Sequence, residues 1–197
     1  MSVWFSFILL LVIAYLLGSI CSAIPICRLF GLPDPRSTGS ANPGASNVMR
    51  LGGKWPAVLT FLTDAFKGTP PILLGYALGL SITQVSLIAV AAILGHLYPL
   101  YYQFKGGKGV ATAFGTLLVL DWRLFVVAGF AWLAIFVLAR ISSVASLGSM
   151  LLAVPIASYL LNDQLLIGVS LIGLLILWRH QQNIRDLVSG AERQFRS

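Results

Sequence analysis

Charged residues are scarce in this sequence: they make up 10% of its 197 residues, whereas 58% of the residues are hydrophobic. Soluble domains usually carry about 25% charged residues. A water-soluble fold of this length cannot bury so much apolar surface, and apolar runs near the length that crosses a bilayer recur along the chain. The composition therefore excludes a soluble protein and predicts an all-α integral membrane protein, with one transmembrane domain over residues 1–197.

Among the charged residues the acidic ones are the fewer. The chain has 6 Asp and Glu against 13 Lys and Arg, so its net charge is +7. In a soluble protein such an excess would suggest a nucleic-acid partner. The aromatic and basic loops typical of RNA-binding proteins are absent here, so we expect no nucleic acid. Membrane proteins instead collect Lys and Arg in their cytoplasmic loops.

Cysteine is also nearly absent, since Cys21 and Cys27 are the two in the chain. Their spacing fits neither a metal site nor a disulfide framework, so we predict that both pack between helices. No other metal-ligand constellation is evident, and we expect no metal and no cofactor. Residues 1–5 carry no positive charge ahead of the first apolar run, so that run should stay as a membrane helix.

Seven apolar segments between breakers predict about seven transmembrane helices. They cover residues 4–24, 55–80, 82–101, 109–121, 123–139, 143–161 and 164–180, approximately. The second segment is long and is interrupted by Lys67, Gly68, Pro70 and Pro71.

The positions of Lys and Arg predict the orientation. With seven spans, one side collects Arg28, Arg36, Arg50, Lys54, Lys105, Lys108, Arg140, Arg179, Arg185, Arg193 and Arg196. The other side collects Arg123, and Lys67 falls inside a span. This bias predicts an N-terminus outside, in the periplasm, and a C-terminus in the cytoplasm.

The first polar cluster runs from Ser37 to Arg50, and every residue from Gly39 to Asn47 is Gly, Ser, Asn, Pro or Ala. Small residues let a backbone approach a ligand closely, and Arg50 can grip a phosphate through two parallel N–H bonds. A plain connector would also be rich in such residues, but this density favours a binding loop. The candidates are Gly39, Ser40, Asn42, Gly44, Asn47 and Arg50.

The second cluster leads directly into a helical pattern that begins near Val110. Its core is Lys105, Gly106, Gly107, Lys108 and Gly109. A glycine-rich turn before a helix points backbone N–H groups at an anion, and the helix dipole favours negative charge there. The spacing is not that of a Walker A loop, so nucleotide hydrolysis is not implied. His96 precedes this cluster and could be either a packing residue or a ligand or proton carrier.

The third cluster spans Arg179 to Glu192. His180 and Asn183 are three positions apart and share one helical face, although a solvated amphipathic tail would explain the segment equally well. Ser143 begins another predicted helix, where its hydroxyl could cap the helix or bind phosphate. Asp64 and Lys67 lie within the second span at i,i+3 and are predicted to form an ion pair that holds the site.

At these clusters the chain resembles the membrane-integral bacterial acyl-phosphate:glycerol-3-phosphate acyltransferases. The matching motifs are G-S-A-N-P-G-A-S-N-V-M-R, D-A-F-K-G-x-x-P, F-K-G-G-K-G-V-A-T and H-x-x-N-I, in this order along the whole chain. Two positions depart from the family pattern. Ser46 stands where Thr is more usual, which keeps the hydroxyl, and Arg185 comes one place early.

The resemblance implies transfer of a fatty acyl group from acyl phosphate to the 1-hydroxyl of sn-glycerol 3-phosphate, as in bacterial phospholipid synthesis. The enzyme would lie among the lipids of the cytoplasmic (inner) membrane, with its active site on the cytoplasmic side. On this reading Lys105, Lys108 and Arg50 hold phosphates, with Glu192 in the same site. Ser40, Asn42 and Ser143 donate hydrogen bonds, and His180 and Asn183 position substrate or stabilise the oxyanion.

Two questions stay open at this stage. The general base could be His96, His180 or a phosphate oxygen of a substrate. The rival function is a membrane transporter of an organic phosphate centred on Asp64, Lys67 and the broken second span, although transporters usually show inverted repeats and a site at the midplane. The sequence leaves the oligomeric state open.

Overall fold

The computed structural model describes residues 2–160 and 163–195, and within them all regular secondary structure is helical. Arg196, one of the basic residues that predicted the orientation, lies outside the described residues. The helices are α1 (Val3–Gly18), α2 (Ala23–Leu29), α3 (Ala45–Gly52), α4 (Lys54–Phe66), α5 (Pro70–Ala77), α6 (Ile82–Leu97), η1 (Leu100–Tyr102), α7 (Val110–Leu120), α8 (Trp122–Ala139), α9 (Ser142–Leu160), α10 (Asp163–Arg179) and α11 (Gln181–Val188).

Each predicted apolar segment is helical over its described residues, and two of them are broken; Leu161, the last residue of the sixth segment, lies outside the described residues. The first becomes α1 and α2, and the second becomes α4 and α5. The second break falls where the breakers predicted it, because α4 ends at Phe66 and Pro70 opens α5 at a position that needs no backbone N–H. Within the described residues, these two breaks leave short polar or small-residue links inside otherwise apolar segments.

Length and composition identify fewer helices that could cross a membrane alone. Four pass that test: Val3–Leu29 taken together, Ile82–Tyr102, α8 and Ser142–Tyr159. The bent pair Gln164–Arg179 and Gln181–Val188 would be a fifth, and α7 is apolar but shorter. The integral membrane class rests on these helices, while the number of seven crossings and their direction stay predictions.

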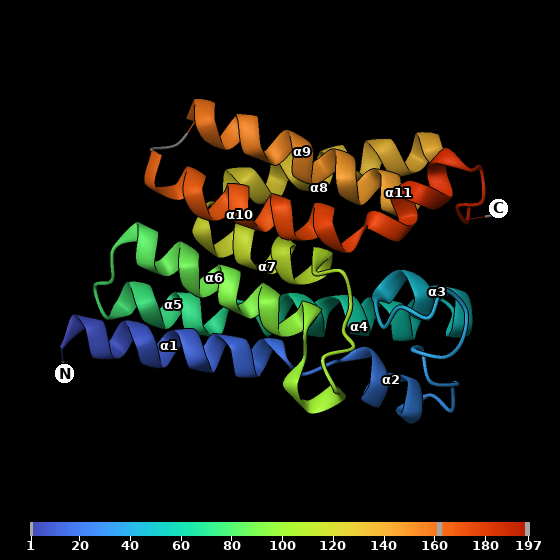
Figure 1. The fold of residues 1–197 in the computed structure, drawn as a ribbon, viewed down its shortest axis with the longest axis horizontal. Helices are drawn as coiled ribbons and strands as arrows, with labels where there is room; N and C mark the ends of the chain where they lie inside the picture. The colour runs from blue at the N-terminus through green and yellow to red at the C-terminus, as the bar shows by residue number, and fades with distance from the viewer. Residues whose placement is uncertain (1, 161–162, 196–197) are drawn as a thin grey trace.

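The helices form a bundle with two unlike ends (Figure 1). The N-terminus lies at one end, and α2, α3, α11 and the C-terminus lie at the other. In the middle, α6 packs against α1, α5, α7 and α10 and carries much of the buried apolar core. Gly18 and Gly95 let α1 and α6 approach closely, since a Cβ at either position would lie 2.1–2.2 Å from a backbone oxygen of the other helix.

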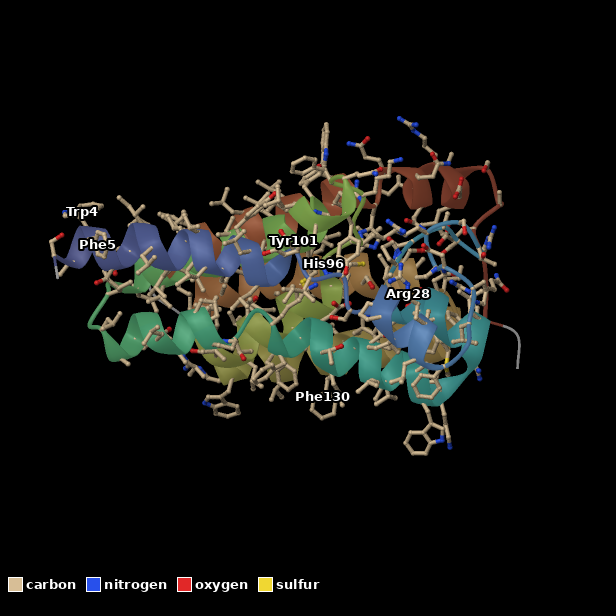
Figure 2. The ribbon with its side chains drawn as sticks, turned by 90° about the horizontal axis from the view of Figure 1, so that it is seen from below. Trp4, Phe5, Arg28, His96, Tyr101 and Phe130 are labelled. Atoms are coloured by element: carbon tan, nitrogen blue, oxygen red, sulfur yellow. The ribbon has the colours of Figure 1, made fainter. Side chains whose placement is uncertain are left out.

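Large apolar side chains also cover the outside of the bundle. Trp4, Phe5 and Phe130 point away from it (Figure 2), and Phe130 is 71% exposed. A soluble protein rarely exposes so many aromatic and aliphatic side chains over so much of its surface. This outer face therefore suits lipid.

Candidate active site

A cavity of about 710 Å³ opens at the end of the bundle that holds α3 and α11. Its lining brings together residues from all three predicted clusters, although these clusters are far apart in the sequence. The predicted residues that line it are Ser40, Asn42, Gly44, Asn47, Arg50, Asp64, His96, Lys108, Gly109, Ser143, His180, Asn183 and Glu192. The predicted residues that do not line it are Gly39, Lys67, Lys105, Gly106 and Gly107.

Within the described residues, five helices begin at this cavity. The first residues of α3, α4, α7, α9 and α11, or the residues just before them, all belong to the lining. The N-terminal turn of a helix carries unpaired N–H groups and a partial positive charge. Converging helix starts therefore make the mouth of the cavity attractive to phosphate before any side chain is counted.

Lys108 adds a full positive charge to this mouth. Its ammonium donates to Oδ1 of Asn183, and it makes no other hydrogen bond among the described residues. Burial lowers the pKa of Lys108 to about 8; Glu192 opposes this change and Arg50 adds to it. A partly desolvated cation with donors to spare is suited to bind a phosphate.

Glu192 organises the residues around Lys108. Its Oε1 accepts a hydrogen bond from the Ser143 hydroxyl at 2.6 Å and from Nδ2 of Asn183 at 2.8 Å. The second bond fixes the Asn183 amide so that Oδ1 faces Lys108. A carboxylate would repel phosphate, so these bonds favour a positioning role for Glu192 in place of the predicted phosphate contact.

His180 has one ring nitrogen available to a ligand. Its Nδ1 lies 2.8 Å from the backbone oxygen of Ile176, which can only accept, so Nδ1 carries the proton. In the neutral ring, Nε2 then has a free lone pair, and Nε2 has no hydrogen-bond partner among the described residues. The side chain is buried and lines the cavity. His180 can therefore accept a proton or a hydrogen bond there.

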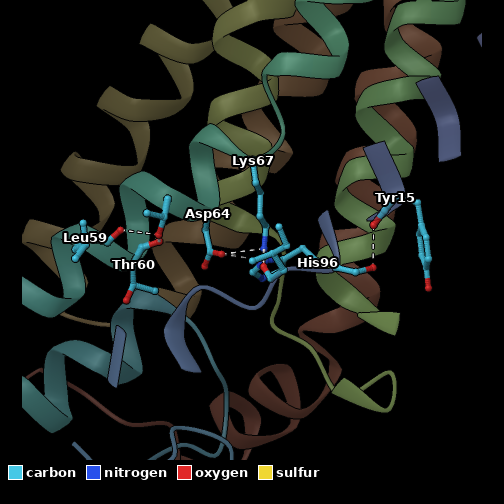
Figure 3. A network of polar contacts seen from close by, with 9 residues as sticks. Tyr15, Leu59, Thr60, Asp64, Lys67 and His96 are labelled. Carbon is cyan, nitrogen blue, oxygen red and sulfur yellow. Dashed lines mark hydrogen bonds and ion pairs between the residues drawn. The ribbon is translucent and has the colours of Figure 1, made fainter. Parts of the chain in front are cut away.

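His96 is held differently, in the buried cluster shown in Figure 3. The Lys67 ammonium lies 2.8 Å from Nδ1 of His96, 2.8 Å from Oδ1 of Asp64 and 2.6 Å from the Ile20 carbonyl oxygen. Since Lys67 donates, Nδ1 of His96 must accept, and the ring keeps its proton on Nε2. This geometry disfavours His96 as the general base.

The predicted ion pair of Asp64 and Lys67 is present, and both side chains are buried. The residues that contact the Lys67 ammonium come from three parts of the chain: Ile20 lies in the link before α2, Asp64 lies in α4 and His96 lies in α6. A buried ion pair fixes geometry more than it adds stability. The pair therefore links these helices rigidly close to the cavity.

The glycines of the second cluster pack against His96, which contacts this ion pair. Gly107 donates its N–H to the His96 carbonyl at 3.1 Å, and a Cβ on Gly107 would lie 2.2 Å from Nε2 of His96. Gly106 is equally tight against the His96 carbonyl. Gly106 and Gly107 therefore pack against His96 outside the lining, and their predicted phosphate contacts stay predictions, whereas Gly109, in the left-handed region, opens α7 at the cavity.

Arg179 is a residue that the sequence reasoning counted only as a basic loop residue. Its guanidinium donates to the carbonyl oxygens of Gly106 at 3.0 Å and Gly107 at 3.2 Å and lies 5.4 Å from the centre of the Tyr98 ring. Arg179 thereby turns the carbonyls of the glycine loop away from the site. Lys105, on the same loop, is exposed and does not reach the lining.

Asn47 and Gly39 hold the first cluster in shape. The Asn47 amide donates to the carbonyls of Pro35 and Thr38, each at 2.9 Å, and its oxygen accepts from the Ser40 N–H at 2.8 Å. Gly39 has a φ of 68°, and a Cβ there would lie 2.2 Å from Oδ1 of Asn47. Asn47 thus holds the loop while lining the cavity, and Gly39 lies outside the lining; their predicted substrate contacts stay predictions.

With the loop held this way, the polar groups that remain free line the cavity. The hydroxyl of Ser40 and the amide of Asn42 make no hydrogen bond within the described residues, and Gly44 opens α3 beside them. Arg50 stacks on the Phe195 ring at 4.3 Å and makes a long bond of 3.5 Å to the Ser46 carbonyl, which leaves other guanidinium donors free.

The deeper part of the cavity is apolar and was not located by the sequence. It is lined from α4, α7 and α8 by Ala57, Val58, Phe61, Phe114, Phe125, Gly129, Trp132 and Phe136. One cavity therefore combines a basic mouth with an apolar depth. That combination suits a molecule with a phosphate at one end and a hydrocarbon chain at the other.

Known proteins are similar in sequence to this chain over nearly its whole length. Residues 8–190 match the family model described as glycerol-3-phosphate acyltransferase. The protein of that name from Idiomarina loihiensis is 50% identical over 96% of each chain. The one from Pseudomonas putida is 47% identical over 96% of this chain and 100% of its own.

Two solved structures have the same fold. A crystal structure of PlsY, an integral membrane glycerol 3-phosphate acyltransferase, in its glycerol 3-phosphate form, superposes with a TM-score of 0.91 at 37% identity. That match covers 97% of this chain and 96% of the other. The lysophosphatidic acid form of PlsY superposes with a TM-score of 0.88 at 35% identity and with the same coverage.

Proposed function

The chain belongs to the glycerol-3-phosphate acyltransferase family, and we propose that its cavity transfers a fatty acyl group from acyl phosphate to the 1-hydroxyl of glycerol 3-phosphate. The products are lysophosphatidic acid and inorganic phosphate. The observation that carries the proposal is the two-part cavity, with Lys108 and the converging helix starts at its mouth and aromatic side chains in its depth.

Both substrates carry a phosphate, so the mouth must hold two anions. The helix starts of α3 and α7 lie in the lining with Arg50 and Lys108, and those of α9 and α11 lie beside Asn183. Arg50 and Lys108 come from different segments and offer separate cationic contacts. Ser40 and Asn42 supply neutral hydrogen bonds that orient the substrates.

The chemistry follows from the donor. In acyl phosphate the carbonyl carbon is bonded through oxygen to phosphate, which is a good leaving group, so direct attack by the substrate hydroxyl suffices. The hydroxyl oxygen forms the new ester bond, the bond from the carbonyl carbon to the phosphate oxygen breaks, and the hydroxyl proton passes to a base. Nε2 of His180 is the best placed base, because it is unprotonated in the neutral ring and belongs to the lining.

Charge develops on the carbonyl oxygen and on the departing phosphate during this step. The Lys108 ammonium, held by Asn183, and the N–H groups of the helix starts are preorganised to stabilise that charge. Glu192 keeps Asn183 and Ser143 in place without touching the reacting atoms.

The position in the cell follows from the substrates. Glycerol 3-phosphate is a soluble anion of the cytoplasm, and the basic residues predict that the cavity end of the bundle faces that side. The acyl phosphate and the product are amphiphiles that would enter and leave through the lipid. We therefore place the protein in the bacterial inner membrane with the cavity on its cytoplasmic side.

The test uses detergent-purified full-length protein, palmitoyl phosphate and labelled glycerol 3-phosphate. Labelled lysophosphatidic acid should form without coenzyme A or acyl carrier protein, and an exposed-loop variant, Lys105→Met, should behave as the wild type. Uptake of glycerol 3-phosphate into vesicles with no product would instead support the transporter. Product formation that requires an acyl thioester would contradict the proposed donor.

A further inference from the structure

The apolar arm of the cavity follows one face of α8. Phe125, Gly129, Trp132 and Phe136 are spaced four, three and four positions apart, so they lie along one side of that helix. Trp132 stacks on Phe136 with ring centres 4.9 Å apart, and its indole N–H donates to the Ser146 hydroxyl at 3.1 Å. This wall begins beside the polar mouth and is held rigidly near it.

The far end of the arm is closed by three rings. Phe114 on α7 lies 6.1 Å from Phe125 on α8, edge to face, and 6.3 Å from Phe61 on α4. Phe114 is itself buried. The aromatic trio of Phe61, Phe114 and Phe125 therefore forms the floor of the arm, where three helices meet.

The length of the arm matches a membrane acyl chain. Phe125 and Phe136 lie near the two ends of α8, and the rise of about 1.5 Å per residue gives roughly 16 Å between them. One leaflet of a bilayer has a hydrocarbon thickness of about 15 Å, half of the roughly 30 Å core. A fatty acyl chain of ordinary membrane length would thus reach the floor.

Gly129 stands halfway along the wall and is unlike the packing glycines of this bundle. A Cβ on Gly129 would meet no atom within 4 Å, whereas a Cβ on Gly115 of α7 would lie 2.1 Å from the Ala65 carbonyl oxygen. A glycine inside a helix costs about 1 kcal/mol relative to alanine, and helix packing does not require one at Gly129. The space next to Gly129 belongs to the cavity.

We infer that Gly129 and Phe125 determine which acyl chain lengths the enzyme accepts: Gly129 keeps the middle of the arm open, and Phe125 sets its end. The inference rests on the proposed function, since it takes the acyl chain of the donor as the occupant. A bulky side chain at Gly129 would exclude the outer methylenes of a long chain and leave the mouth intact. A smaller side chain at Phe125 would deepen the arm.

The experiment compares octanoyl, dodecanoyl, palmitoyl and stearoyl phosphates as competing donors for full-length Gly129→Leu, Phe125→Ala and wild-type protein. Each methylene pushed out of the arm should reduce kcat/KM by up to roughly fourfold. Gly129→Leu should therefore shift the preference toward short chains by tenfold or more, with the KM for glycerol 3-phosphate unchanged. Phe125→Ala should shift it toward stearoyl phosphate.

Ala134→Leu is the matched control, because it adds the same side chain to an exposed position of α8. It should leave the chain-length preference as in the wild type. Active Gly129→Leu protein with wild-type preference would overturn the inference, as would an inactive Gly129→Leu together with an unshifted Phe125→Ala. Wild-type protein that acylates glycerol 3-phosphate with none of the acyl phosphates would overturn the proposed function instead.

Discussion

Two polar networks line the same cavity, one buried and one part-buried, and they differ in whether the lysine at the centre of each has all its donors satisfied. In the first, Lys67 places its ammonium protons on Asp64, His96 and the Ile20 carbonyl. In the second, Lys108 has Asn183 as its one hydrogen-bond partner among the described residues. A fully paired cation holds helices together, whereas a cation that lines a cavity and has free N–H donors can bind a ligand.

The two histidines repeat the contrast. His96 uses Nδ1 to accept from Lys67 and has Nε2 packed over Gly107. His180 donates from Nδ1 to a carbonyl and keeps Nε2 for the cavity. Residue type is therefore a poor guide to chemistry here, and the partners of each ring nitrogen decide it.

The largest expected effect tests the histidines. Replacing His180 with Gln removes the proposed proton acceptor, so kcat should fall by about 10² to 10⁴. Binding of glycerol 3-phosphate should change little, which isothermal titration with the purified variant would measure. A wild-type kcat in the His180→Gln enzyme would indicate that a phosphate oxygen of a substrate, and not His180, is the general base.

The two loop lysines give the next comparison. Lys108→Met should lower kcat/KM by about 10² to 10³, because a preorganised charge at the reacting phosphate is lost. Lys105→Met, three positions away and exposed, is the matched control and should stay within about twofold of the wild type. Equal losses in both variants would mean that the loop binds phosphate through general charge and not through Lys108.

Disrupting the Lys67 network, whose donors are satisfied, should lower the stability of the folded protein. Lys67→Met leaves the buried carboxylate of Asp64 without its cation, and breaking such a pair costs about 3–5 kcal/mol. The melting temperature in detergent should fall clearly. The double variant Asp64→Asn with Lys67→Met should recover part of the loss, since it buries no unpaired charge. A double variant less stable than Lys67→Met alone would show that the pair is more than a mutual neutralisation.

The smallest effect concerns pH. Burial depresses the pKa of Lys108 to about 8, so in the empty site the ammonium is present below that pH and is lost as the pH rises through it. A bound phosphate favours the charged form, so binding above pH 8 must take up a proton. Affinity for the acyl phosphate, whose phosphate Lys108 is proposed to contact, should therefore weaken by about tenfold per pH unit above 8.

Lys108→Arg is the control for that titration, because a guanidinium stays charged throughout the range. Its affinity should be flat between neutral pH and pH 9, measured by titration calorimetry at each pH. The same decline in Lys108→Arg as in the wild type would assign the titration to another group.

Much of the fold was predictable because the signals are local. Apolar runs predicted the helical segments, and Lys67 to Pro71 predicted the break between α4 and α5. The three clusters were found from small, basic and polar residues in short windows. Hydropathy and turn chemistry act over a few neighbouring residues, so a sequence shows them directly.

The roles within the clusters were less predictable. Asn47, Gly106 and Gly107 were expected to touch substrate. The structure shows the Asn47 amide bonded to Pro35, the Gly107 N–H bonded to His96 and the carbonyls of both glycines bonded to Arg179. Arg179 showed no signal beyond its charge. The sequence around Gly129, inside an apolar helix, gave no sign of a role in the cavity, because open space beside a glycine depends on helices elsewhere in the chain.

The sequence by itself determined that this is a helical membrane protein with three polar clusters of a phosphate-handling kind. Tertiary structure alone decided which lysine and which histidine keep a polar atom free for a ligand in the cavity, and that the depth of the cavity is apolar and ends at Phe125. The physical reason is that a donor is free or satisfied according to its partners. Those partners, such as Asn183 for Lys108 and His96 for Lys67, come from distant segments that only folding brings together.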